Sequence, residues 1–137
     1  MTTRTRTCQV IKLEAGFDSK QAVTYFGGIS AHNTGTQGIC LHLTTIPPGG
    51  RAKSHLHENH ETAIYIPQGW GGMWYGDNLS EHLMVKAGEY PYIPASMPHL
   101  PHNPSDAEPI IALVARTDAN EQKSVVLLPD LDTVDAE

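Results

Sequence analysis

Three histidines and one glutamate are spaced so that their side chains can share a metal ion. His55 and His57 are separated by one residue, Glu61 follows after three more, and His99 lies far downstream. Alternate side chains of a β-strand point to the same side, so a strand through His55 and His57 turns both imidazoles one way. A turn over residues 58–60 would bring the Glu61 carboxylate back to them. Three imidazoles and one carboxylate suit one divalent transition metal (Fe, Mn, Ni, Zn, Co or Cu) better than Ca or Mg.

Short strands separated by turns must position these side chains. The 137 residues include 12 Gly and 10 Pro, which interrupt the chain often and argue against long helices. Apolar residues come in short bursts between the turns, which is typical of an all-β sandwich, jelly roll or small barrel. We identify no helix, read residues 15–36 as a loop and 67–72 as a turn, and expect strands at 9–13, 39–46, 54–57, 62–66, 73–75, 83–85, 90–93, 99–103, 110–116 and 124–128.

Charge and composition exclude several classes of protein. The net charge of −6 comes without a basic cluster, which argues against nucleic acid or a membrane surface as a partner. No apolar run approaches the length of a membrane span, and no apolar stretch follows the first residues as in a secretory signal. Cys8 and Cys40 make no disulfide framework. These observations favour a cytoplasmic protein, and the length favours one domain.

A second segment, over residues 88–103, has a regular spacing of Gly, Pro, His and Asn. Gly88 is followed after five residues by Pro94, after four more by His99, and after three more by Asn103. Together with residues 49–61, this segment resembles the two signature motifs of the cupin superfamily. The first motif is Gly, five residues, His-x-His, three or four residues, Glu, six residues, Gly. The second is Gly, five residues, Pro-x-Gly, two residues, His, three residues, Asn.

Two positions depart from these motifs. The closing glycine of the first motif comes one residue late, with Gln68 at the expected place and Gly69 after it. Ser96 replaces the glycine of Pro-x-Gly. Neither position holds a metal ligand in the family. The departures therefore concern local turns, since glycine often marks a positive φ.

The resemblance implies the fold of the family, an all-β double-stranded β-helix, which is the cupin jelly-roll barrel. It implies a single cupin domain over residues 1–137, with its motifs at about 49–69 and 88–103. It also implies a homodimer that exchanges an N-terminal strand, for which residues 10–13 are the candidate. The acidic residues 130–137 are expected to fray.

The resemblance also implies a site and a range of activities. The metal would be held by His55, His57, Glu61 and His99, with open positions for a small substrate that chelates through oxygen, such as an enolate, a 2-oxo acid, a diol or a 1,3-diketone. With iron the protein would be a dioxygenase-like oxidoreductase, and with Zn, Ni or Mn a Lewis-acid isomerase, cyclase or decarboxylase. The alternative is a non-catalytic module that binds a metal or a small ligand. The complete ligand set favours the enzyme.

Other polar residues are weaker candidates for a role in the site. Tyr65 shares the strand parity of Glu61, so it either lines the cavity as an acid or base or is a barrel aromatic. His60 is a structural residue or orients a ligand from outside the site. His102 is expected outside the barrel, and the side that His42 faces stays open. Arg51 and Lys53 are interpreted as solvated turn charges, His32 and His82 as surface residues, and Asn103 as a brace for a turn.

Overall fold

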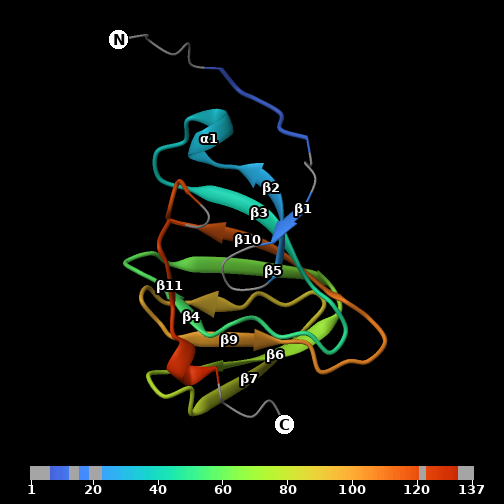
Figure 1. Cartoon of the computed structure of the whole chain (residues 1–137). Coiled ribbons are helices and arrows are strands. Elements are labelled where there is room, and N and C mark those ends of the chain that lie inside the picture. Colours follow the sequence, from blue (N-terminus) through green and yellow to red (C-terminus); the bar gives the residue numbers. More distant parts are fainter. Residues whose placement is uncertain (1–6, 13–15, 19–22, 121–122, 133–137) are drawn as a thin grey trace.

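Two antiparallel sheets pack against each other in the computed structural model, which describes residues 7–12, 16–18, 23–120 and 123–132 (Figure 1). The six-stranded sheet has the order β1-β2-β3-β10-β5-β8, and the five-stranded sheet has the order β11-β4-β9-β6-β7. The all-β jelly-roll fold predicted from the sequence is confirmed. The elements are β1 (Gly16–Asp18), β2 (Thr24–Ile29), α1 (Ala31–Thr34), β3 (Cys40–Ile46), β4 (His55–His57), β5 (Thr62–Gln68), β6 (Trp70–Tyr75), β7 (Glu81–Lys86), β8 (Tyr92–Ile93), β9 (His99–His102), β10 (Ile110–Arg116), β11 (Val125–Leu127) and the 3₁₀ turn η1 (Pro129–Leu131).

The central strands of the larger sheet alternate between a buried and a more exposed face, as half-buried strands must. Every second residue of β3 is buried, beginning with Cys40. β10 lies between β3 and β5 and pairs antiparallel with both. Its inward residues meet apolar side chains from several strands in one core cluster. The buried members of that cluster are Val23, Tyr25, Ile46, Ala52, Ile66 and Ile110.

The connection between β5 and β6, which belong to different sheets, differs from the turn predicted over residues 67–72. The strands run on to Gln68 and from Trp70, so only Gly69 separates them. Gly69 has φ +90, and a Cβ there would lie 2.4 Å from the carbonyl oxygen of Pro109. Only glycine satisfies both conditions, so one residue makes a turn for which the sequence pattern suggested six.

The N-terminal region holds more structure than the loop predicted over residues 15–36. β1, β2 and α1 all lie in that range, and Tyr25 is a buried core residue. The register between β2 and β3 shifts between Phe26 and Ile29, so no regular alternation marks this strand. Residues 9–12 are not in a strand, and the exchange strand proposed for 10–13 ends at a residue outside the described part of the chain.

The described part of the segment expected to fray, residues 130–132, contacts the rest of the chain. Pro129–Leu131 form a 3₁₀ turn, and the Asp132 carboxylate accepts a hydrogen bond from the Ser54 backbone N–H at 2.6 Å. A buried N–H needs a partner, which explains the order at Asp132. Residues 133–137 lie outside the described part of the chain. Among the described residues, no helix has the length and apolar character to cross a membrane.

Candidate metal centre

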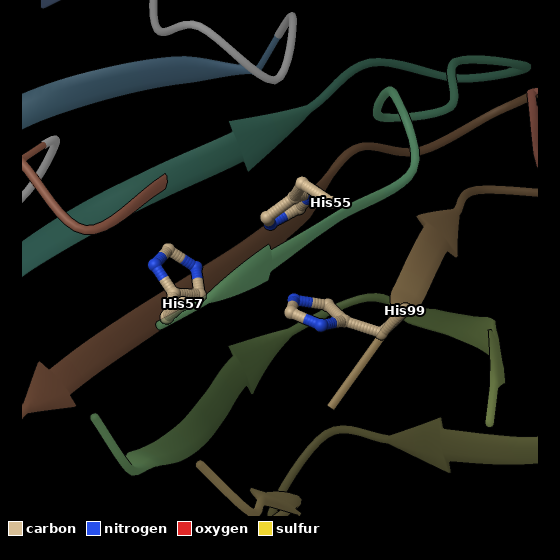
Figure 2. A group of neighbouring side chains, drawn as sticks. All are labelled: His55, His57 and His99. Atoms are coloured by element: carbon tan, nitrogen blue, oxygen red, sulfur yellow. The ribbon is translucent and has the colours of Figure 1, made fainter. Parts of the chain in front are cut away.

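His55, His57 and His99 meet inside the barrel, from β4 and β9 (Figure 2). One ring nitrogen of each lies within 4.8 Å of the others. All three side chains are buried. β4 and β9 pair antiparallel with His55 directly opposite His99, while strand alternation turns His57 to the same side as His55. The expected juxtaposition of the three histidines is therefore present.

Backbone hydrogen bonds orient two of the rings. The Nδ1 atom of His55 lies 2.7 Å from the carbonyl oxygen of Lys53, and that of His99 lies 2.8 Å from the carbonyl oxygen of Met97. A carbonyl accepts, so each Nδ1 carries the proton and each Nε2 keeps its lone pair for a ligand. The buried Nδ1 of His57 has no hydrogen-bond partner among the described residues. These nitrogen donors fit a transition metal ion.

The three imidazoles are neutral at physiological pH. Burial is the largest cause of the pKa shift of each of the three rings. It lowers the pKa of His99 to about 4, and it lowers the pKa values of His55 and His57 well below the usual value. The positive charge of Arg116 lowers all three pKa values further. Neutral imidazole is the form that ligates metals, so burial prepares the group for a cation.

The structure does not bring Glu61 to this group. Within the described residues, the histidines alone form the cluster of potential ligands. Glu61 is exposed, and its carboxylate accepts a hydrogen bond from the Tyr92 hydroxyl at 2.5 Å. That bond raises the pKa of Tyr92. Glu61 immediately precedes β5 and has the outward parity of that strand, since Thr62, the next residue, faces inward with 1% exposure.

Thr62 and Arg116 occupy the inward positions beside the histidines. They face each other across the β5–β10 pairing, and Arg116 Nε donates a hydrogen bond to Thr62 Oγ1 at 3.1 Å. Both are buried. This pair was not singled out from the sequence, although a signal for it existed. Thr62 is separated from His57 by four residues and from the late glycine, Gly69, by six residues.

The histidines, Thr62 and Arg116 line one cavity of about 110 Å³ between the sheets. The rest of its wall is mainly apolar and includes Ile64, Ile66 and Val85. Among the described residues that line it, Arg116 is the charged side chain and none is acidic. The volume is below the roughly 300–1,000 Å³ of sites for drug-sized ligands. The cavity therefore suits a small ligand with an apolar part.

Tyr65 and His60 lie outside the cavity wall. Tyr65 packs against exposed Tyr90 with ring centroids 4.9 Å apart, because odd-numbered positions of β5 face outward in this register. The Nδ1 atom of His60 lies 2.7 Å from the carbonyl oxygen of Thr117, and its Nε2 lies 3.8 Å from Asp118. Tyr65 is therefore not part of the cavity wall, where one of its two interpretations from the sequence placed it, and His60 braces the chain beyond the end of β10.

His42 faces the interior, which the sequence had left open. It is 3% exposed and stacks on Tyr25 with ring centroids 4.2 Å apart. Neither ring nitrogen has a hydrogen-bond partner among the described residues. Burial, with a smaller contribution from Arg116, lowers the pKa of His42 to about 3.

His102 and His82 form a second group of histidines, and His102 lines the same cavity as His55, His57 and His99. Their Nε2 atoms lie 3.0 Å apart, so the N–H of one ring donates to the nitrogen of the other. Trp74 stacks on His102 with ring centroids 4.2 Å apart. A Cβ at Gly72 would lie 2.4 Å from the His102 Nε2 and 2.6 Å from the His82 Nε2. His102 was expected outside the barrel, but it is buried, and Gly72 leaves space for both rings.

Two antiparallel sheets around a buried histidine group define the class of this protein. Residues 42–116 match the family model described as Cupin domain. The match covers more than half of the 137 residues, and the chain belongs to the cupin family. No curated protein matches the chain significantly by sequence.

Solved structures show the same fold. Oxalate decarboxylase from Bacillus subtilis at pH 4.6 matches with a TM-score of 0.70 and 24% identity, over 84% of this chain and 30% of that chain. A structure from work on the Mn(II) centres of the same enzyme matches with a TM-score of 0.70 and 23% identity, with the same coverage. This chain thus spans about 30% of the length of those proteins. At these identities the likeness concerns the fold.

Proposed function

We propose that this cupin is a metal-dependent enzyme that holds one divalent transition metal through His55, His57 and His99 and acts on a small substrate that chelates through oxygen. The observation that carries the proposal is the three neutral, buried imidazoles with ligand atoms within 4.8 Å of one another. The proposed ligand set leaves out Glu61, because its carboxylate is exposed and bonded to Tyr92.

The protein would contribute position and environment. A divalent metal bound there would supply Lewis-acid polarisation or, with iron, redox chemistry. The carbonyls of Lys53 and Met97 hold two imidazoles in the ligating tautomer. The apolar wall excludes water from the substrate and strengthens the electrostatic interactions inside. Decarboxylase, isomerase, cyclase and dioxygenase-like chemistry all remain within this proposal.

Metal analysis of protein purified without an affinity tag tests the site. We expect close to one transition metal per chain. Replacing His57 and His99 together by alanine should empty the site, because one imidazole is left. Glu61→Gln is the matched control and should keep the metal. Retained stoichiometric metal in the double variant, or loss of metal in Glu61→Gln, would contradict this ligand set.

Turnover distinguishes the enzyme from a non-catalytic binder. Protein reconstituted anaerobically with Fe(II) is mixed with a panel of chelating substrates, and oxygen uptake is followed after air is admitted. Oxygen uptake supports a dioxygenase-like activity. Turnover with Zn, Ni or Mn but without oxygen uptake supports Lewis-acid chemistry. Tight binding without turnover on any metal would favour the binding module. The homodimer and the cytoplasmic location stay predictions, the first tested by the mass of the protein in solution.

A further inference from the structure

We propose that a surface cleft beyond the end of β10 binds a small polar molecule through its ammonium group, which the carboxylate of Asp118 holds. This site is independent of the proposed metal centre, and the two cavities share no lining residue among those described. The cleft has a volume of about 390 Å³ and lies between the turn after β4 and residues 117–120 and 123–124. Sites for small molecules have volumes of about 300–1,000 Å³, so the cleft is large enough for such a ligand.

The carboxylate of Asp118 is buried, and one of its two oxygens has no donor. The residue is 7% exposed. Its Oδ1 atom accepts a hydrogen bond from the Asn120 backbone N–H at 3.0 Å, whereas its Oδ2 atom has no hydrogen-bond partner among the described residues. A buried carboxylate oxygen without a donor is costly. A ligand that donates to Oδ2 would remove this cost, so Asp118 favours a ligand with a positive charge.

His60 presents a second acceptor beside that oxygen. Its Nδ1 atom lies 2.7 Å from the carbonyl oxygen of Thr117, and because a carbonyl accepts, this nitrogen carries the proton. In the neutral form of the ring the Nε2 atom then has a lone pair, and it lies 3.8 Å from Asp118 Oδ2. That distance is too long for a hydrogen bond. Two acceptors that do not bond to each other can both bond to one donor group.

The Ser124 hydroxyl is a further polar group in the wall of the cleft. Its Oγ atom is buried and has no hydrogen-bond partner among the residues that the structure describes. Lys123, the next residue towards the N-terminus, is exposed and also lines the cleft. A hydroxyl both donates and accepts, so Ser124 can bind either the ammonium group or another polar group of the ligand. The cleft therefore suits a ligand that is polar throughout.

An ammonium group fits these acceptors better than a metal ion does. Zinc sites in proteins usually have three or four side-chain ligands. Within the described residues, the cluster of potential metal ligands is the one in the barrel, and His60 and Asp118 do not belong to it. An ammonium group has several N–H donors for acceptors on more than one side. It also carries the charge that strengthens a hydrogen bond to a carboxylate.

An NMR titration of the isotope-labelled protein at neutral pH and constant ionic strength tests the site. The probes are ethanolammonium chloride and ethylene glycol, which have nearly the same shape and differ in charge. We expect ethanolammonium to shift the backbone amide signals of Glu58 and Asn120 until they saturate. It should bind at least about tenfold more tightly than ethylene glycol, which is the scale of a hydrogen bond to a charged group. Equal binding of the two probes, or binding of neither, would overturn the proposal.

Variants locate the effect. Asp118→Asn keeps an acceptor for the Asn120 N–H but removes the charge, so it should bind ethanolammonium at least about tenfold more weakly. Asp77→Asn, at an exposed turn position, is the matched control and should bind as the wild type does. Lys123→Gln should bind at least as tightly as the wild type, because it removes a like charge from the cleft. Wild-type affinity in folded Asp118→Asn would overturn the assignment.

Zinc distinguishes an ammonium site from a metal site. In protein that has received one equivalent of Zn²⁺, ethanolammonium should still bind, because the cleft and the barrel cavity share no lining residue among those described. A second equivalent of Zn²⁺ that binds tightly, displaces ethanolammonium and is lost in Asp118→Asn would overturn the proposal in favour of a metal ion. The metal content of the barrel does not enter this comparison, so failure of the proposed function gives a different result.

Discussion

Gly72 shows how much the absence of one side chain matters at the scale of a residue. It lies between β7 and β9, opposite Met84 on one side and His102 on the other. The rings of His82 and His102 use the space above it to form their hydrogen bond. The backbone at Gly72 does not have a positive φ, which is the usual reason for a glycine in a turn. The space that the two rings need therefore explains this glycine.

Gly72→Ala is expected to lower the free energy of unfolding by about 1–3 kcal/mol, as overpacking does. Its Cβ would be 2.4 Å and 2.6 Å from the two Nε2 atoms, while Trp74 packs against the His102 ring. Denaturant unfolding measures the effect. Gly38→Ala is the control, because a Cβ at Gly38 meets nothing within 4 Å, and it should change stability by less than about 0.5 kcal/mol. Equal stability of the two variants would show that the rings move aside freely.

At the scale of elements, β4 is held to the chain terminus by a small set of polar contacts. Ser54, directly before β4, has no exposed surface. Its backbone N–H and its hydroxyl each lie 2.6 Å from the same carboxylate oxygen of Asp132, and Arg51 donates to the Asp132 carbonyl at 3.0 Å. β4 carries two of the three clustered histidines. The C-terminal segment therefore contributes to the site without entering it.

Asp132→Ala should lower the free energy of unfolding by roughly 1–3 kcal/mol, because it leaves the buried Ser54 N–H without its acceptor. It should also weaken metal binding, since the strand that carries His55 and His57 loses its anchor. Denaturant unfolding and competition with a chelator measure the two effects. Asp77→Ala, at an exposed turn position, should alter neither. Unchanged unfolding of Asp132→Ala would show that the C-terminal contacts do not hold β4.

The sequence predicted some elements far better than others, for physical reasons. The predicted strand 110–116 matches β10, because apolar residues fill it and turn formers bound it. Strand parity predicted that His55 and His57 face the same side, and the resemblance to the cupin motifs added His99. The spacing alone did not show where β5 begins. Asn59 adopts φ 63 in the preceding turn, and β5 starts at Thr62, so the inward position falls one residue beyond Glu61. A shift of one residue reverses the face of a strand.

At the scale of the whole molecule, several histidines are buried in the neutral form. Burial, with contributions from His82 and Arg51, lowers the pKa of His102 to about 4, and burial with Arg116 lowers that of His42 to about 3. In the unfolded chain a histidine has a pKa near 6.5. Between the two values the unfolded chain therefore binds more protons than the folded protein does, and acid favours unfolding.

Stability of the metal-free protein is expected to be full above about pH 6.5 and to fall as the pH drops towards 4. Each such histidine contributes up to about 1.4 kcal/mol per pH unit in that window. Denaturant unfolding between pH 4.5 and 7.5 gives the slope. His102→Gln should reduce the slope, because it removes one of the titrating groups, while exposed His32→Gln should leave it unchanged. A stability that is constant across this range would contradict the burial of neutral histidines.

The cavity and the hydrophobic core share their residues. All six buried members of the core cluster also line the cavity that contains the histidines. A substitution that reshapes the cavity for another ligand therefore also repacks the residues that hold the two sheets together, and repacking a core changes stability. New ligand specificities are consequently open to this chain mainly through volume-conserving exchanges, so the route by which its specificity can evolve is narrow.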